Sequence, residues 1–328
     1  RNMVTAASSA DAAVVLVDAT KVDWPSADLA LLPQTRRHSL LLKLLRVPTI
    51  IFAINKLDAV DKPELAFTHI AQALQRFADD AAIDIHAMVP ISALKGWNVV
   101  TTLPDWCGYS GPSLLSLLEN VPVTPSDEEA ELSFAVQWVE KFHDSATTNQ
   151  GRRVYWGPVA TGVAQVGDAV RVFPSGQQAV VKEVLTAVRL PTSVSAGHSA
   201  GIVLDREVDL SRGDWLVSSQ SSLQPSKQLD VTVAWLDDEP LVAGRVYWAL
   251  HGHQWVKAKV ASITDRLDIH SLESLPASEL PANAIGRVQL SFQQPLLTLP
   301  YGRSRTLGSM VLVDTASHKT SAAVMVQG

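Results

Sequence analysis

The most constraining stretch of the chain is the run Thr49–Asp58, in which an apolar segment ends abruptly in Asn-Lys-Leu-Asp. The apolar part is short and rich in β-branched residues, as expected for a strand buried on both faces of a parallel sheet. In an open α/β sheet, ligands bind just beyond the carboxyl ends of the strands. Asn55, Lys56 and Asp58 fall at that position, so this stretch predicts both a fold class and a binding site.

The pattern Asn-Lys-x-Asp is the guanine-recognition motif of P-loop GTPases, and its chemistry explains the residue types. Guanine offers two adjacent donors, its ring N–H and its exocyclic amine, and an ionised Asp58 can accept both. Adenine lacks this pair and would leave the carboxylate unpaired. Asn55 can donate an amide N–H to the purine and join neighbouring loops, while Lys56 can lay its aliphatic stem along the base. The alternative interpretation of these four residues is a polar turn after a strand, which is common. The motif therefore indicates guanine binding only where the neighbouring sequence gives it a matching context.

The segment Met88–Gly96 supplies that context, because it is another apolar strand that ends in a small polar turn. The turn begins with Ser-Ala-Leu, and small residues there let a backbone N–H approach the carbonyl of guanine. The two motifs follow two successive predicted strands in the order found in GTPases. We therefore expect six residues to form one nucleotide-binding site. They are Asn55, Lys56, Asp58, Ser92, Ala93 and Leu94.

Strand and helix patterns alternate through residues 1–124, which indicates a parallel α/β sheet. Ala12–Asp18 is a second apolar run and predicts a fully buried strand. Helices are expected over 34–45, from Pro63 to about Asp80, and over 113–119. We interpret residues 1–124 as the C-terminal part of a GTP-binding α/β domain. The connection 21–33 is long, and the sequence gives no reason for its length.

The composition changes at Val121–Glu129, where two prolines and three acids predict a linker. Beyond it, helical periodicity gives way to short alternating strands, of which 134–139 is expected to be one. Turn residues recur about every ten positions, the spacing of a small β-barrel. A polar break at 218–226 separates two such runs. We predict a first barrel over 128–222 and a second over 226–328, so the fold class is α/β plus all-β.

Composition also limits the function. The formal net charge of −6 argues against nucleic-acid binding by phosphate neutralisation. No apolar run approaches the roughly 20 residues that span a bilayer, and no signal peptide is recognisable. The single cysteine, Cys107, excludes an internal disulfide and a cysteine-cluster zinc site, and we expect it to pack as a small hydrophobe. We expect a cytoplasmic protein with no metal ligands of its own and no membrane or nucleic-acid partner.

The order of one nucleotide-binding domain and two barrels resembles the translational GTPases of the elongation factor Tu type. The closer resemblance is to the large GTPase subunit (subunit 1) of bacterial sulfate adenylyltransferase, and it covers nearly the whole chain. Besides the two nucleotide motifs, several segments carry this resemblance. They are Arg-Asn-Met-x-Thr-x-x-Ser at 1–8, Val-Asp-Ala at 17–19, Gln-Thr-Arg-Arg-His-Ser at 34–39, Gly-x-Asn-Val at 96–99 and Asp-x-Ser-Arg-Gly-Asp at 209–214.

The resemblance implies a GTPase subunit in which GTP hydrolysis is coupled to the synthesis of adenosine 5′-phosphosulfate from ATP and sulfate. It implies GTP as the bound nucleotide, with Mg²⁺ in the complete protein. It also implies a heterodimer with a small catalytic subunit, which performs the adenylyl transfer.

The chain departs from this family in its phosphate-binding elements. A P-loop GTPase holds its phosphates with Gly-x-x-x-x-Gly-Lys-Ser/Thr, and neither this motif nor the Asp-x-x-Gly loop occurs in the sequence. In the family both precede the segment that resembles Arg1–Ser8, so we interpret the chain as lacking its natural start and expect no catalytic residue in it. Two alternatives remain open: a non-catalytic scaffold that kept the fold, and an RNA-binding translation factor.

The pair His251 and His253 is a further candidate, because two histidines close together could ligate a metal. The pair flanks Gly252 between two predicted strands. We therefore expect a hairpin turn here rather than a metal site.

Overall fold

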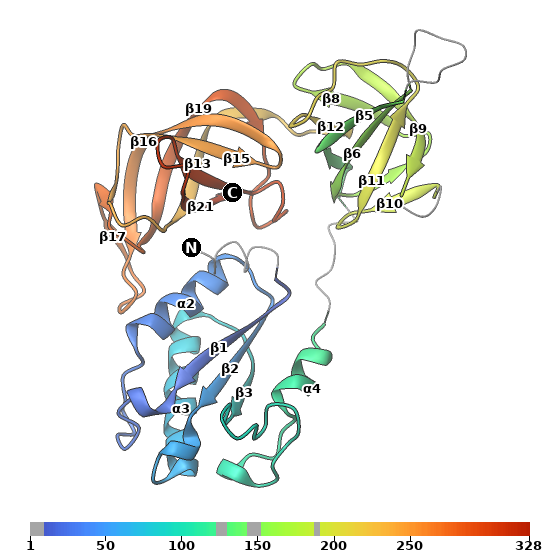
Figure 1. The fold of residues 1–328 in the computed structure, drawn as a ribbon. Coiled ribbons are helices and arrows are strands. Elements are labelled where there is room, and N and C mark those ends of the chain that lie inside the picture. The colour runs from blue at the N-terminus through green and yellow to red at the C-terminus, as the bar shows by residue number, and fades with distance from the viewer. Residues whose placement is uncertain (1–9, 123–129, 143–151, 187–190) are drawn as a thin grey trace. The chain divides into compact units, whose positions relative to one another are not determined.

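The structure is a computed structural model that describes residues 10–122, 130–142, 152–186 and 191–328 (Figure 1). The segment 1–8 and most of the expected linker at 121–129 lie outside the described residues. The chain divides into two compact units, one made of 1–124 with 267–275 and the other of 125–266 with 276–328.

The first unit is built on a three-stranded parallel sheet, which confirms the predicted α/β class. Its strands are β1 (Ala12–Asp18), β2 (Thr49–Asn55) and β3 (Ile85–Pro90), in the order β1-β2-β3. The central strand β2 has every residue buried except its last, Asn55. The burial follows from the central position, because β2 has a neighbour on each side and side chains packed on both faces.

Three helices cover this sheet: α2 (Pro33–Leu44), α3 (Pro63–Ala81) and α4 (Leu114–Glu119). Both long helices begin with a proline, which has no N–H to leave unpaired in the first turn. α2 contacts β1, and α3 contacts β3. α4 contributes Leu114 and Leu117 to a cluster on buried strand residues that include Ile51 and Val89.

The long connection between β1 and α2 packs along α3. His69 Nδ1 lies 2.9 Å from the carbonyl oxygen of Trp24, and Arg76 donates to the carbonyl of Ala27 at 3.0 Å. Leu29 and Leu31 of the same connection are buried. The length of this connection, for which the sequence offered no reason, allows it to run along α3 and to form these hydrogen bonds with it.

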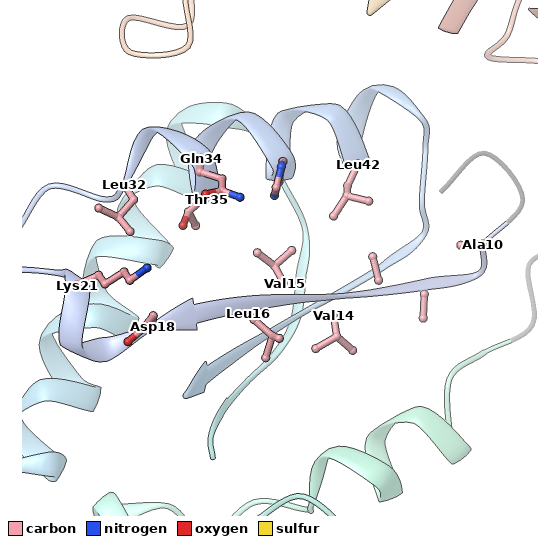
Figure 2. Close-up of a pocket in the computed structure, with 13 residues that line it drawn as sticks. Ala10, Val14, Val15, Leu16, Asp18, Lys21, Leu32, Gln34, Thr35 and Leu42 are labelled. Carbon is pink, nitrogen blue, oxygen red and sulfur yellow. The ribbon is translucent and has the colours of Figure 1, made fainter. Parts of the chain in front are cut away.

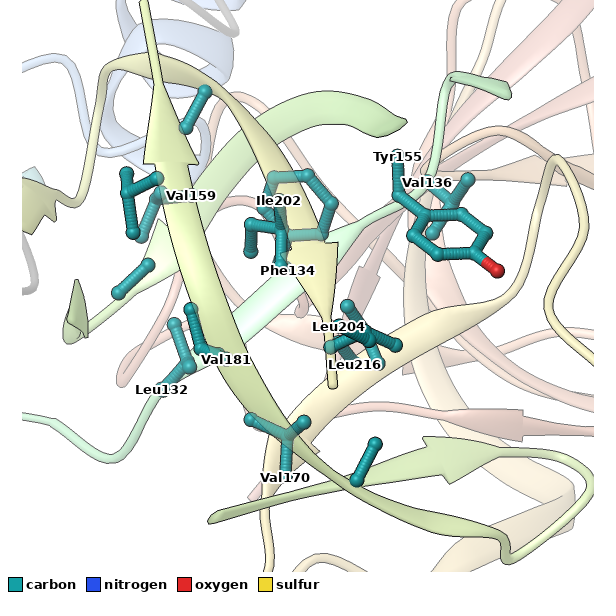
Figure 3. Packing of buried hydrophobic residues seen from close by; sticks show 14 of the residues in the cluster. Leu132, Phe134, Val136, Tyr155, Val159, Val170, Val181, Ile202, Leu204 and Leu216 are labelled. Atoms are coloured by element: carbon teal, nitrogen blue, oxygen red, sulfur yellow. The ribbon is translucent and has the colours of Figure 1, made fainter. Parts of the chain in front are cut away.

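The second unit begins with a six-stranded antiparallel barrel. Its strands run in the order β11-β9-β8-β12-β4-β6, and a β11–β6 pairing closes the barrel. Figure 3 shows Phe134, Ile202 and Leu216 among the side chains that fill its core. The elements of this region are β4 (Ser133–Ala135), β5 (Trp138–Phe142), β6 (Arg152–Thr161), β7 (Val163–Gln165), β8 (Ala169–Phe173), β9 (Gln178–Leu185), β10 (Ser193–Ser195), β11 (Ser199–Leu204) and β12 (Trp215–Ser218).

The expectation of one strand over 134–139 is wrong, because the chain turns a barrel corner there. β4 and β5 are separate strands that pair with different halves of β6. At the corner, β6 carries Gly157, where an added Cβ would lie 1.9 Å from the carbonyl oxygen of Ala135. Only glycine permits this close approach of two backbones. The residue that marks the interruption between β4 and β5 is therefore Gly157 of β6, which lies outside the segment 134–139.

A second six-stranded barrel follows, in the order β15-β20-β21-β13-β19-β16, closed by a β15–β16 pairing. The hairpin expected at His251–His253 is confirmed, since β15 ends at His251 and β16 begins at Gln254. The strands of this region are β13 (Pro225–Trp235), β14 (Leu241–Val242), β15 (Val246–His251), β16 (Gln254–Leu267), β17 (Ser274–Pro276), β18 (Glu279–Leu280), β19 (Ile285–Leu297), β20 (Ser309–Asp314) and β21 (Thr320–Val326).

The two barrels share a buried junction within the second unit. Trp215 of β12 and His251 of β15 have stacked rings, with centroids 5.5 Å apart and planes 29° apart. The two nitrogens of His251 lie 3.0 Å and 2.9 Å from the carbonyl oxygens of Ser309 and Leu297. The apolar part of the junction combines side chains from both barrels, namely Ala135, Ala160, Trp215, Val217, Leu297 and Leu307.

None of the helices in the described ranges has the length and apolar character needed to cross a membrane.

Candidate nucleotide-binding site

The candidate site lies where the three parallel strands end. The register pairs Asp18 with Asn55 and Ile54 with Pro90, so the last residues of β1, β2 and β3 lie side by side. The two sequence motifs follow β2 and β3 directly. Parallel pairing therefore brings the motifs to one edge of the sheet, which is the edge where open α/β sheets bind ligands.

Asn55 joins the two motif loops. Its side-chain oxygen accepts hydrogen bonds from the backbone N–H groups of Lys56, at 2.8 Å, and Ala93, at 3.0 Å. Its amino group has no hydrogen bond to any residue that the structure describes. Asn55 thus uses its oxygen to fix the loops, and its two amide N–H donors have no partner among the described residues.

Lys56 is held in an unusual conformation and by a charged partner. Its φ of +65° lies in the left-handed region, which disfavours residues with a Cβ. Its ammonium lies 2.7 Å from Oδ2 of Asp18. Burial acts to raise the pKa of Asp18, but hydrogen bonds from Lys56 and Thr20 outweigh it and hold the pKa below its usual value. The Asp18–Lys56 pair is therefore intact at neutral pH, and is lost only as the pH falls through this lowered pKa.

Asp58 lies in a single 3₁₀ turn (Leu57–Ala59) that is anchored by the fully buried Leu57. Its side chain is half-buried. Across the described part of the chain, neither a hydrogen bond nor an ion pair engages the Asp58 carboxylate. A carboxylate in a fixed turn with both oxygens open is suited to accept two donors from a ligand.

The second motif forms a tight turn in which Ser92 and Leu94 differ sharply. Ser92 is fully buried, and its hydroxyl oxygen accepts the N–H of Lys95 at 3.2 Å. Ser92 therefore shapes the turn rather than presenting its hydroxyl to solvent. Leu94 has 88% of its surface exposed, which is unusual for a leucine in a folded turn and leaves an apolar face beside the motifs.

Asn98 is a supporting residue that sequence reasoning did not single out. It is fully buried at a φ of +54°, where asparagine is better tolerated than most residues. Its amide donates to the carbonyl of Pro90 at 3.0 Å and accepts from the N–H of Leu103 at 2.6 Å. It thereby ties the loop after the second motif to the end of β3. In the sequence, the Gly-x-Asn-Val pattern at 96–99 was the feature that could have pointed to Asn98.

Cys107 lies in the same loop region and is buried, as expected. Burial, reinforced by the nearby carboxylate of Glu64, raises the pKa of the Cys107 thiol to about 12. A thiol that stays protonated is a poor nucleophile, so Cys107 acts as a packing residue.

A pocket of about 470 Å³ lies along β1, beside the candidate site (Figure 2). Figure 2 shows Asp18 and Lys21 at one end of the pocket and Val14 and Leu16 along the strand. The expected full burial of 12–18 is wrong, because Leu16 is 63% exposed. Among the described residues β1 pairs only with β2, so one strand edge and the adjoining face remain uncovered.

Within the described ranges, no group of three or more His, Cys, Asp or Glu side chains is arranged to hold a metal ion. A nucleotide-bound Mg²⁺ is usually held by one or two side chains together with phosphate oxygens and water, so this absence bears only on a metal site built from several protein ligands.

Comparison with known proteins agrees with the fold and with the order of its domains. The family profile described as "Elongation factor Tu GTP binding domain" matches residues 1–125, and "GTP-eEF1A C-terminal domain-like" matches 228–327. Fold and site thus define a protein of the elongation factor Tu-like GTPase class. Sulfate adenylyltransferase subunit 1 from Yersinia enterocolitica is 36% identical over 328 residues, and that from Sodalis glossinidius is 37% identical over 328 residues. The chain belongs to the family of sulfate adenylyltransferase subunit 1.

The chain is aligned over its full length with these relatives, and it spans 66% of their length. The fold also resembles solved structures. The crystal structure of Sup35 complexed with GDP has a TM-score of 0.55 and 20% sequence identity, and the match covers 97% of this chain and 78% of that one. This likeness identifies the same arrangement of an α/β sheet followed by two barrels.

Proposed function

We propose that the chain carries the guanine-binding site of the GTPase subunit of a sulfate adenylyltransferase. Membership of the subunit 1 family supports this role. The single observation that carries the guanine assignment is the Asp58 carboxylate, which is fixed in a turn and open on both oxygens, next to the loops joined by Asn55.

The chain's own residues would recognise the base in four ways. Asp58 accepts the ring N–H and exocyclic amine of guanine, and Asn55 donates an amide N–H to the purine. Lys56 and the exposed Leu94 provide apolar surface for the two faces of the ring. The turn that Ser92 shapes presents the backbone N–H groups that follow it, and Ala93 keeps the approach to the base open. These six residues bind and orient the base, and none of them performs phosphate chemistry.

At the level of the whole protein, we propose that GTP hydrolysis is coupled to the formation of adenosine 5′-phosphosulfate from ATP and sulfate. The adenylyl transfer belongs to a small partner subunit, which fits the description of the relatives as subunit 1. The expected assembly is a cytoplasmic heterodimer in which the barrels at 128–222 and 226–328 support docking of the partner. Residues 1–124 serve as the nucleotide-binding part.

We expect the chain to bind GMP in preference to AMP. Saturation-transfer NMR suits this test because it detects ligands that bind at millimolar concentration. Saturation of the protein should reach the H8 proton of GMP and should leave AMP nearly unchanged. GMP should also displace a fluorescent guanosine nucleotide that AMP does not displace.

Equal transfer to both nucleotides would contradict guanine recognition. Absence of transfer to either would favour a scaffold that has kept the fold without nucleotide binding. Salt-dependent binding to RNA would instead indicate a translation factor.

A further inference from the structure

We infer that Asp18 is a positioning residue for guanine binding. It holds the ammonium of Lys56 at the end of β1, so that the methylene stem of Lys56, rather than its charge, faces the base. The inference rests on the proposed function, since it gives one residue of that site a partner from the neighbouring strand. Sequence reasoning placed Asp18 at a strand end but assigned it no part in the site.

The first observation that supports this role is that the two carboxylate oxygens of Asp18 have different partners. Oδ1 accepts the backbone N–H of Thr20 at 3.0 Å and the hydroxyl of Thr20 at 2.6 Å. Oδ2 lies 2.7 Å from the ammonium of Lys56. The carboxylate is therefore already fixed through one oxygen when the other meets Lys56. An exposed ion pair normally gains little, because both side chains must be immobilised. Here only the lysine has to be ordered.

The second support is the backbone of Lys56. Its φ of +65° is an uncommon conformation for a residue with a Cβ, and such conformations concentrate at functional sites. The pairing of Asp18 with Asn55 places the end of β1 beside the residue that precedes Lys56. The stem of Lys56 thus crosses from the end of β2 to the end of β1, at the edge where the base is proposed to bind.

The third support is the chemistry of a lysine beside a neutral purine. A free ammonium is strongly hydrated and remains mobile on its flexible stem. Pairing with Asp18 gives the ammonium a fixed position away from the base, and the side chain still has 54% of its surface exposed. The methylene groups of this side chain can then serve as an apolar platform that is ordered before a ligand arrives. Ordering in advance lowers the entropy lost on binding.

The contact itself can be tested without a nucleotide. The rate at which an amine-acylating reagent modifies Lys56 is measured by mass spectrometry, with the exposed Lys62 as an internal reference. We expect Asp18→Asn to raise the rate at Lys56 several-fold and to leave Lys62 unchanged. Asp61→Asn, which removes an exposed acid close in sequence, should change neither rate. Equal rates at Lys56 in the wild type and Asp18→Asn proteins would overturn the inference.

The consequence for binding is tested with GMP as the probe. Asp18→Asn should weaken GMP binding about two- to fivefold, the range expected for an exposed pair. Thr20→Val should act in the same direction by less. Lys56→Met keeps an unbranched apolar stem without the charge. In that background Asp18→Asn should have no further effect, because a positioning residue acts only through Lys56.

The outcomes separate the two proposals. If wild-type protein does not bind GMP, the proposed function and this inference both fail. If GMP binds and Asp58→Asn abolishes binding, while Asp18→Asn has no effect, only the role of Asp18 fails. If Asp18→Asn weakens binding equally in the Lys56→Met background, Asp18 does not act through Lys56 and the inference is wrong.

Discussion

Replacing Asp58 by Asn is expected to reverse the base preference of the site from guanine to xanthine. The Asp58 carboxylate is half-buried, fixed in a turn and open on both oxygens. It can accept two donors from guanine, whereas an asparagine at this position offers one acceptor and one donor. Xanthine carries a carbonyl in place of the exocyclic amine, so it matches the asparagine. Two charge-assisted hydrogen bonds of about 1.5–3 kcal/mol each correspond to a loss of roughly 10²–10⁴ in affinity for guanine.

The measurement is a competition titration of GDP against XDP with wild-type and Asp58→Asn proteins. Wild type should prefer GDP and the variant should prefer XDP. Asp61→Asn is the matched control, because it removes the same charge from an exposed position three residues away and should leave the preference unchanged. If Asp58→Asn still preferred GDP over XDP, Asp58 would not be the residue that reads the base.

The Trp215→Ala substitution is expected to lower the free energy of unfolding of the second unit by about 3–5 kcal/mol, as for other large-to-small changes in a core. Trp215 is fully buried and stacks on His251. An added Cβ at Gly252 would lie 2.8 Å from its ring, so the opposing hairpin is shaped around the indole. Removal leaves a cavity that the closed barrels on both sides cannot easily fill. Chemical denaturation monitored by circular dichroism measures the loss.

Two further variants make this prediction specific. Trp138→Ala removes the same side chain from an exposed position, and it should change stability by no more than about 0.5 kcal/mol. Trp215→Phe should cost less than Trp215→Ala. It keeps an aromatic ring and removes an indole N–H that has no hydrogen-bond partner among the described residues. Equal losses for Trp138→Ala and Trp215→Ala would show that the junction contributes little.

The parts of the fold that could be predicted from the sequence are those in which a local pattern repeats. The apolar run at 49–54 predicted the central strand β2, because burial on both faces removes polar residues from the whole run. The hairpin at Gly252 was predicted because glycine marks a tight turn. The helix predicted over 113–119 is present as α4, and Ser113 caps it, since its hydroxyl accepts the N–H of Ser116 at 3.3 Å.

The parts that could not be predicted depend on contacts between distant segments. The interruption between β4 and β5 depends on Gly157, which belongs to another strand, β6. The sequence of 134–139 contains no residue that predicts it. The Asp18–Lys56 pair joins residues 38 positions apart and depends on the register of two strands. The six site residues were predicted from motif order. The Gly-x-Asn-Val pattern makes Asn98 visible in the sequence, but its role in tying the loop to the end of β3 follows only from its three-dimensional contacts.

The junction between the two barrels has a consequence for how the protein melts. Its apolar cluster draws side chains from both barrels, and the ring of Trp215 from one barrel rests on His251 of the other. If one barrel unfolded alone, its neighbour would be left with a newly hydrated apolar face and an exposed imidazole. Heating should therefore produce one heat-absorption peak for both barrels, and its calorimetric enthalpy should equal its van't Hoff enthalpy. Two closed sheets would then behave as a single thermodynamic domain.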